Sequence, residues 1–463
     1  MKKIFILSLI AGAFVLVCSL LFTSCGDEIT TYGGDKYFNY VPEFQHTYFS
    51  KGVDEIKPNE LALYVDYSTC NVLGQNSPFY QALVPSWVNA TKKYYSIKGN
   101  EISEEDIDDP EDGDDVYTLL KSIEEVNYAD LATAITQMSK SNTESVLLTD
   151  GEYYKQSIAK GNINNPYMAN ALKTWITRGH DIFFFSEPYV EPYNGQNFHK
   201  KRFYIIFTDV RLENNIYDRI MQTTTLQQFP EVEIFHLSAD HPALSAEGFN
   251  TKPNDNLNAK VQGFGSFEAQ EWEIAWKNGI EPLVVNAVNP ETGEALPNGE
   301  CVTGGLKIDR NSFGGYRIKS VKANVYNINQ EFSDFANNKE QNIKVGGKLE
   351  PLSPAINFIV LDNKEFDKHG IVNLYFDTPM YTPDFVLNGS PYNYFKIDIC
   401  ISEVEDIFAK QFAHQFEFES IDMPGQTNTS VAESIKQCLA DPGIKAMISS
   451  CPIYSIYVKS IER

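Results

Sequence analysis

The sequence feature that most constrains the fold is Leu61–Cys70, LALYVDYSTC, a continuous apolar run that ends in an acid and hydroxyls. Every residue of Leu61–Val65 is apolar or aromatic, and Asp66, Ser68 and Thr69 come directly after it. A run of this kind suits a parallel strand that is covered on both faces. Open α/β sheets bind their ligands at the carboxyl ends of such strands. The stretch therefore predicts a buried strand with a ligand-binding acid at its end.

A second stretch has the same form. Ser145–Gly151, SVLLTDG, is a short apolar run that ends in Asp150 and a turn glycine. Together the two stretches resemble the von Willebrand factor A (vWA) family, whose metal-dependent adhesion site combines an Asp-x-Ser-x-Ser loop with a Thr-Asp-Gly loop. The resemblance implies that the two strands are neighbours, so that Asp66 and Asp150 open onto one crevice. It also implies that an acidic group of a partner completes the ligand set of the metal.

The resemblance implies a site for Mg²⁺ or another divalent cation, and the sequence departs from the family pattern at two positions. Cys70 stands where the loop has its second serine, and a thiol is a soft ligand that Mg²⁺ does not favour. Ala129 falls where the family has a distant threonine, with Asp130 next to it. Asp130 supplies an oxygen ligand in one interpretation and caps the following helix in the other. In a further alternative, the acids only hydrogen-bond loop amides. The implied ligands are Asp66, Ser68, Asp130 and Asp150.

Strands and helices alternate along residues 58–237. This alternation favours an α/β fold with a doubly wound, mostly parallel sheet of the vWA or Rossmann kind. Further strands are expected at Asp181–Ser186, Arg202–Thr208 and Glu231–Leu237, with a Pro/Gly/Asn-rich loop between the first two. The acid-rich Glu101–Asp115 does not match a calcium-binding EF-hand loop, because Leu119 falls where the last ligand acid belongs. We interpret that stretch as a solvated loop.

The pattern changes near Ser238. From there the chain is rich in Gly, Asn and Pro and contains short strand-like runs. Such spacing predicts antiparallel β structure over residues 238–463, more like a sandwich than a barrel, with a late amphipathic helix at Ser430–Leu439. Cys438 and Cys451 either pair or remain separate buried thiols, and the scattered cysteines imply no disulfide framework.

The amino-terminal segment Met1–Cys25 has two lysines, an apolar stretch and small residues before a cysteine. It resembles a bacterial lipoprotein signal in which Cys25 becomes the lipidated first residue; the alternative is a plain transmembrane helix. Acids directly after Cys25 resemble the surface-export signal of Bacteroidetes lipoproteins. We therefore expect residues 26–57 to be a tether and the protein to be anchored in the outer membrane, exposed at the cell surface. A net charge of −24 argues against a nucleic-acid partner.

These features favour a non-catalytic, surface-anchored adhesion protein with a protein partner. A glycan-binding surface lipoprotein is the first alternative, because the region after Ser238 is rich in aromatic residues and Asn. A metal-assisted hydrolase using Asp66, Ser68 and Asp150 is the weaker alternative. No G-x-S-x-G motif surrounds Ser68, and the patterns around His180 and His236 are more typical of structural histidines.

Overall fold

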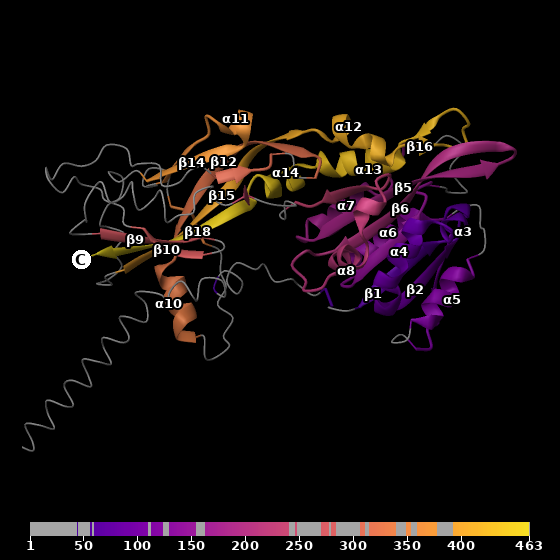
Figure 1. Ribbon diagram of the computed structural model, residues 1–463, viewed down its shortest axis with the longest axis horizontal. Coiled ribbons are helices and arrows are strands. Elements are labelled where there is room, and N and C mark those ends of the chain that lie inside the picture. Colours follow the sequence, from indigo (N-terminus) through magenta and orange to yellow (C-terminus); the bar gives the residue numbers. More distant parts are fainter. Residues whose placement is uncertain are drawn as a thin grey trace, which may run out of the picture.

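The computed structural model describes an α/β domain and an antiparallel β-rich region, which a carboxyl-terminal segment connects (Figure 1). The residues described are 44, 56–57, 60–109, 113–123, 129–153, 163–239, 246–247, 270–276, 279–283, 306–310, 314–338, 349–352, 359–376 and 392–462. The predicted signal segment with Cys25, and Cys301, lie outside them. Within these ranges no helix is both long enough and apolar enough to span a membrane.

A seven-stranded sheet forms the centre of the α/β domain, in the order β3-β2-β1-β4-β6-β5-β7. Strand β1 pairs in parallel with both β2 and β4. The remaining neighbours pair antiparallel, so the sheet is mixed, with its parallel part at β2-β1-β4. The strands are β1 (Leu61–Asp66), β2 (Thr91–Lys98), β3 (Glu101–Glu105), β4 (Glu144–Thr149), β5 (Asp181–Tyr193), β6 (Gln196–Thr208) and β7 (Glu233–Leu237).

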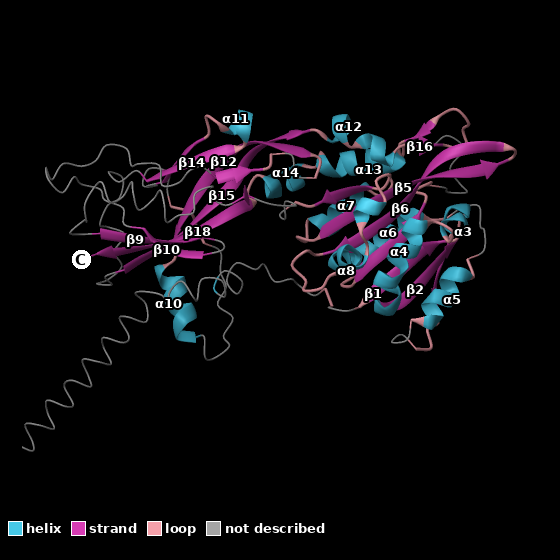
Figure 2. Cartoon of the chain, viewed as in Figure 1, coloured by secondary structure: helices cyan, strands magenta, loops and turns pink. Residues whose placement is uncertain are grey.

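Helices cover both faces of the sheet, as the α/β prediction requires (Figure 2). Leu63 and Val65 of β1 pack with helices α4 (Pro78–Trp87), α5 (Asp114–Lys121) and α8 (Ile216–Thr223). Tyr64 and Ala62 face the other way, toward α6 (Leu131–Lys140) and α7 (Ala169–Ile176). All six residues of β1 and of β4 are buried. The continuous apolar runs are therefore explained by burial on both faces.

The predicted loop between Asp181–Ser186 and Arg202–Thr208 is wrong. Strands β5 and β6 continue through it as one long hairpin, paired from Asp181 and Thr208 to Tyr193 and Gln196. The turn is Asn194-Gly195, and both residues have positive φ, 48° and 76°. Asn-Gly is the pair that suits such a two-residue turn, because both residues tolerate the left-handed region. The hairpin replaces a crossover helix and makes this half of the sheet antiparallel.

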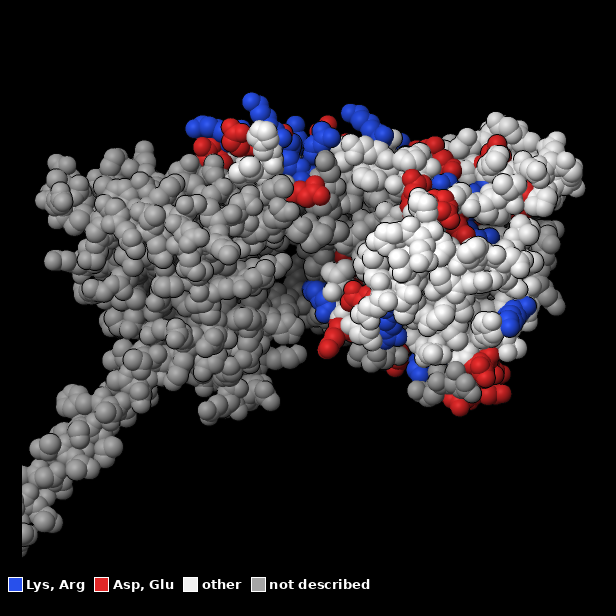
Figure 3. Space-filling model, viewed as in Figure 1, with Lys and Arg blue, Asp and Glu red and all other residues white. Residues whose placement is uncertain are grey.

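The loop interpretation of Glu101–Asp115 is wrong for its first five residues, which form the edge strand β3. Strand β3 pairs antiparallel with β2, and Tyr95 donates a hydrogen bond of 2.9 Å to Glu104. Acidic side chains on an edge strand discourage pairing with another chain. Helix α5 begins nearby with Asp114 and Asp115, and acidic side chains gather at this end of the domain (Figure 3).

The β-rich region consists of antiparallel sheets, as expected from the sequence. One has the strand order β10-β9-β18-β15-β12 and another has β13-β14-β11-β8. The four described cysteines, Cys70, Cys400, Cys438 and Cys451, are buried free thiols, so Cys438 and Cys451 do not pair. The elements are β8 (Ala246–Glu247), β9 (Gln270–Trp276), β10 (Gly279–Leu283), β11 (Leu306–Ile308), β12 (Tyr316–Asn327), α10 (Asn329–Asn338), β13 (Ile359–Asp362), α11 (Phe366–His369), β14 (Ile371–Phe376), β15 (Tyr392–Asp406) and β18 (Pro452–Glu462).

The segment between β15 and β18 packs on the α/β domain rather than on the β-rich sheets alone (Figure 1). The ring of Phe416 lies 5.5 Å from Phe184, 6.1 Å from Phe203 and 5.5 Å from Phe235, measured between centroids. These three phenylalanines lie on β5, β6 and β7, so the segment packs on the antiparallel half of the sheet. The covering elements are α12 (Phe408–Gln411), a 3₁₀ turn (Ala413–Phe416), β16 (Phe418–Glu419), β17 (Thr427–Asn428), α13 (Ser430–Leu439) and α14 (Pro442–Ile448).

Helix α13 packs against α7. Ser434 accepts a hydrogen bond of 3.2 Å from the backbone N–H of Met168, immediately before α7. Lys173 of α7 forms an ion pair with Asp441, the N-cap of α14. The predicted boundary at residue 238 therefore marks a change in the sequence pattern. It does not separate two hydrophobic cores, because one core includes residues from both sides of it.

Candidate functional site

The two strand-end acids meet at one edge of the sheet, because β1 and β4 are parallel neighbours. Asp66 is the last residue of β1, and Asp150 directly follows β4. Thr149 donates a hydrogen bond of 2.9 Å from its hydroxyl to Oδ2 of Asp66, joining the two strand ends. The prediction that Asp66 and Asp150 share one edge is confirmed.

Asn71, in helix α3 (Thr69–Gly74), ties the same two strands together from behind the acids. Its Nδ2 donates to the backbone carbonyls of Asp66 at 2.6 Å and of Leu148 at 3.1 Å. The side chain is fully buried, so these bonds satisfy carbonyls that water does not reach. Sequence reasoning did not single out Asn71, because an asparagine after a strand has no distinctive local pattern.

The Asp66 carboxyl group has a pKa well above its ordinary value. Burial is the largest cause, and the nearby charge of Asp150 is the second. The hydrogen bond from Thr149 and the nearby Ser68 hydroxyl lower the pKa by less than these effects raise it. Asp66 therefore favours keeping its proton in this buried place.

Asp66→Asn tests this shift. The raised pKa means that the folded state holds a proton that the unfolded chain releases above its ordinary pKa of 3.8. Wild-type stability therefore falls as the pH rises above this value, and asparagine removes that loss. We expect the variant to gain stability relative to wild type as the pH is raised from about 4, measured by urea midpoints. Glu101→Gln, on the exposed edge strand, is the control. Parallel pH profiles for wild type and Asp66→Asn would contradict the shift.

A lysine from the hairpin completes this edge. The Lys200 side chain is fully buried, and its Nζ lies 2.9 Å from Oε1 of Glu152 and 3.6 Å from Oδ2 of Asp150. The Phe418 ring, from the carboxyl-terminal segment, lies 5.0 Å from the same nitrogen. Burial acts to lower the pKa of Lys200, but the charges of the acids outweigh it and raise the pKa, so the amine is an ammonium at neutral pH. Burial raises the pKa of Glu152 to about 7, against the lowering effect of Lys200.

A second buried cation lies two residues along the same strand. Arg202 forms an ion pair with Glu187, 2.7 Å from Nη1 to Oε2. Its Nε and Nη2 donate to the backbone carbonyl of Cys70 at 3.1 and 2.8 Å. A Cβ on Gly74 would lie 2.7 Å from the Arg202 Nε, so the guanidinium requires glycine there. Sequence reasoning expected Arg202 to begin a strand but gave it no role, and it left Lys200 in the predicted loop. The Asn194-Gly195 turn signal was the clue that would have placed Lys200 on the same strand.

The predicted metal ligands are only partly brought together. Asp130 caps α6 instead: its Oδ1 accepts from the Thr133 N–H at 3.1 Å, and its Oδ2 accepts from the Thr133 hydroxyl at 2.7 Å. This confirms the capping alternative. Oδ1 of Asp150 accepts from the Glu152 N–H at 2.9 Å, and its other oxygen faces Lys200. Within the described ranges, no group of three or more His, Cys, Asp or Glu side chains is placed to hold a metal ion.

This arrangement suits Mg²⁺ poorly. Mg²⁺ requires near-octahedral oxygen ligands, and here an ammonium already lies beside Asp150 and Glu152. Cys70 adds no ligand, because burial raises the pKa of its thiol and keeps it protonated. Divalent-cation binding by the wild-type chain thus stays a prediction, and Lys200 argues against it.

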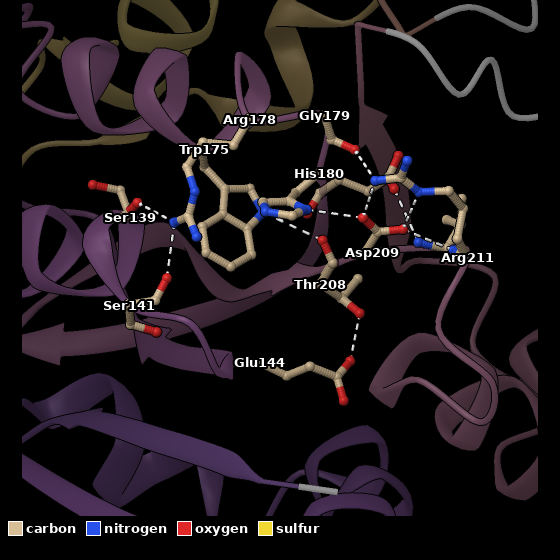
Figure 4. A network of polar contacts seen from close by, with 12 residues as sticks. Ser139, Ser141, Glu144, Trp175, Arg178, Gly179, His180, Thr208, Asp209 and Arg211 are labelled. Atoms are coloured by element: carbon tan, nitrogen blue, oxygen red, sulfur yellow. Dashed lines mark hydrogen bonds and ion pairs between the residues drawn. The ribbon is translucent and has the colours of Figure 1, made fainter. Parts of the chain in front are cut away.

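The two histidines considered in the sequence lie near the amino end of β5, away from the strand-end acids. His180 belongs to a separate polar network with Asp209 and Arg211 (Figure 4). His180 is buried and pairs through Nδ1 with Asp209 at 2.8 Å. His236 pairs with Asp181 at 2.8 Å. Burial acts to raise the pKa of Asp209, but hydrogen bonds from Arg211 and His180 outweigh it and hold the pKa well below its usual range. Each imidazole has a carboxylate partner within the fold, which is typical of structural histidines.

Comparison of the chain with protein-family models, with curated proteins and with solved structures finds no match.

Proposed function

We propose that the chain is a lipid-anchored adhesion protein of the cell surface, with a vWA-like α/β domain, a sandwich-like β-rich region and a protein partner. The partner binds at the carboxyl edge of β1 and β4, where the family implied by the sequence motifs binds its own partners. Asp66 and Asp150 shape this edge. The arm formed by the β5–β6 hairpin, residues 187–202, provides the contact surface.

The observation that carries this proposal is the position of the arm. Strand β4 stops pairing with β6 at Thr149 and Phe203, and the hairpin continues beyond that point. The part from Gln196 to Arg202 extends roughly 20 Å past the end of β4. Val190 and Tyr193 of the arm are each 47% exposed. An apolar side chain and an aromatic one on a projecting strand pair are typical of contact residues in protein interfaces.

The arm is held firmly enough to present these residues. The backbone N–H of His199 donates to Glu419 of β16 at 2.6 Å, and the Arg202 guanidinium lies 4.8 Å from the Tyr189 ring. The first contact ties the arm to the carboxyl-terminal segment, and the second links the two strands of the arm to each other. A braced arm loses little conformational entropy on binding, and pre-organisation of this kind favours affinity.

The test replaces the two exposed residues together, Val190→Ser with Tyr193→Ser. Labelled protein that lacks the expected signal segment and its lipidated cysteine, residues 26–463, is applied to arrays of purified extracellular proteins and of glycans. We expect saturable binding to protein spots, weakened about tenfold or more in Kd by the double substitution, because exposed aromatic contacts often dominate interface energy.

The matched control is Tyr117→Ser with Met221→Ser, on α5 and α8. These residues are 45% and 43% exposed and lie outside the arm. The control is expected to bind as wild type does. Equal losses in both double variants, or saturable binding to glycans alone, would contradict the proposal; the second result would favour the glycan-binding alternative.

A further inference from the structure

We propose that the Lys200 ammonium takes the place of a divalent cation beside Asp150 and Glu152, and that removing it turns this edge into a divalent-cation site. The inference concerns the buried acids of the edge and does not depend on what the arm binds. It accounts for both departures from the family motif, Cys70 and Ala129, since an ammonium needs neither a second hydroxyl nor a distant threonine.

The first argument is geometric. Lys200 reaches the edge from β6, the strand next to β4, and its nitrogen lies 2.9 Å from Glu152 and 3.6 Å from Asp150. The side chain is wholly excluded from solvent, so its charge is neutralised by these protein carboxylates and not by water. The ammonium thus lies where carboxylate oxygens from the β4 end converge.

The second argument is the balance of charge. Asp150 and Glu152 bring two acidic groups to one buried place beside Lys200, and the charge of Glu191 also acts on Lys200. Buried acids require a counter-charge. Arg202 pairs with Glu187 and the Cys70 carbonyl, and among the described residues Lys200 is the cation in ion-pair contact with Asp150 and Glu152.

The third argument is that the lysine is held in place. The Phe418 ring lies 5.0 Å from its nitrogen, and a Cβ on Gly151 would lie 2.8 Å from Val431 and 3.0 Å from Phe203. Phe418 and Val431 belong to the carboxyl-terminal segment, which therefore closes the edge on the side of the lysine. An ammonium over an aromatic face is further stabilised there by the ring electrons.

The experiment compares Lys200→Met with Lys201→Met. Lys201 is the next residue, is partly exposed and pairs with Glu233 at 3.2 Å, so it controls for losing a lysine from the same strand. Thermal unfolding is followed with and without Mn²⁺, and Mn²⁺ binding is titrated by calorimetry. Wild type and Lys201→Met are expected to show no Mn²⁺ response. Lys200→Met is expected to melt roughly 10 °C lower, because its acids lose their counter-charge, and to recover most of this loss with Mn²⁺.

Asp150→Asn combined with Lys200→Met identifies the ligand. We expect the double variant to melt higher than Lys200→Met in metal-free buffer and to lose the Mn²⁺ response, because one unpaired acid is gone. If Lys200→Met is isolated unfolded, refolding from urea with and without Mn²⁺ replaces the melting comparison. Refolding only in the buffer that contains Mn²⁺ supports the proposal, and failure to refold in either buffer overturns it.

Two other results overturn the proposal. One is stoichiometric Mn²⁺ binding by wild type that Asp150→Asn abolishes, since the lysine would then not occupy the cation position. The other is a Lys200→Met variant that has the same melting temperature as Lys201→Met, and whose melting temperature does not change when Mn²⁺ is added.

Discussion

Replacing Arg202 with methionine is expected to lower the free energy of unfolding by about 3–5 kcal/mol, as when one partner of a buried ion pair is removed. Glu187 would lose its ion-pair partner, with the hydroxyls of Tyr204, at 2.8 Å, and of Ser77 as remaining hydrogen-bond donors. The Cys70 carbonyl would also lose both guanidinium donors. Urea unfolding followed by circular dichroism measures the loss.

A second substitution separates lost charge from lost packing. Glu187→Gln in the Arg202→Met background removes the unpaired carboxylate and is expected to recover a large part of the stability. Arg219→Met serves as the control, since Arg219 lies on α8 and its Nε donates to the Asn214 carbonyl near the surface. An Arg202→Met loss no larger than that of Arg219→Met would contradict the buried ion pair.

Phe416→Ala is expected to cost about 3–5 kcal/mol, the range for deleting a buried aromatic side chain. Phe416 is fully buried among Phe184, Phe203 and Phe235 of the sheet. The loss should appear in the unfolding of the α/β domain, which the fluorescence of buried Trp87 and Trp175 reports once Trp272 and Trp276 are replaced by phenylalanine.

Phe412→Ala is the matched control, because Phe412 is only partly buried and lies 5.4 Å from the Phe235 ring. It should cost clearly less than Phe416→Ala. If Phe416→Ala left the tryptophan transition unchanged, the carboxyl-terminal segment would not belong to the core of the α/β domain.

The sequence was sufficient to predict the parallel part of the sheet and the meeting of its acids. Apolar runs such as Leu61–Val65 reflect burial on both faces, and this property is local. The carboxyl ends of parallel neighbours must share one edge, so placing Asp66 beside Asp150 needed only the strand order. The helix cap at Asp130 was likewise one of two interpretations that local chemistry allowed.

The arm and its lysine could not be placed in this way. Pro188, Pro192 and the charged residues around them are typical of a loop, and they outweighed the Asn194-Gly195 turn signal. Without the arm, Lys200 had no position relative to Asp150. Strand β3 was missed for a similar reason, because its acids suit a solvated loop as well as a protected edge.

The covering of the sheet by the carboxyl-terminal segment leaves no local sign at all. Ser186 donates a hydrogen bond of 2.7 Å to the carbonyl of Gln415, 229 positions away in the chain. Hydrophobic periodicity identifies that a helix such as α13 has an apolar face, but it does not identify what the face will contact.

This late covering has a consequence for how the protein is made. Synthesis proceeds from the amino end, so the strands of the first domain emerge long before the residues that shield Phe184, Phe203 and Phe235. Until those residues arrive, an aromatic surface stays open to water and to neighbouring chains, which favours aggregation of the nascent polypeptide. Contacts so distant in sequence also slow folding, because a long loop must close before they form. The α/β domain is therefore synthesised first, but its hydrophobic core is completed only after the carboxyl-terminal segment has been made.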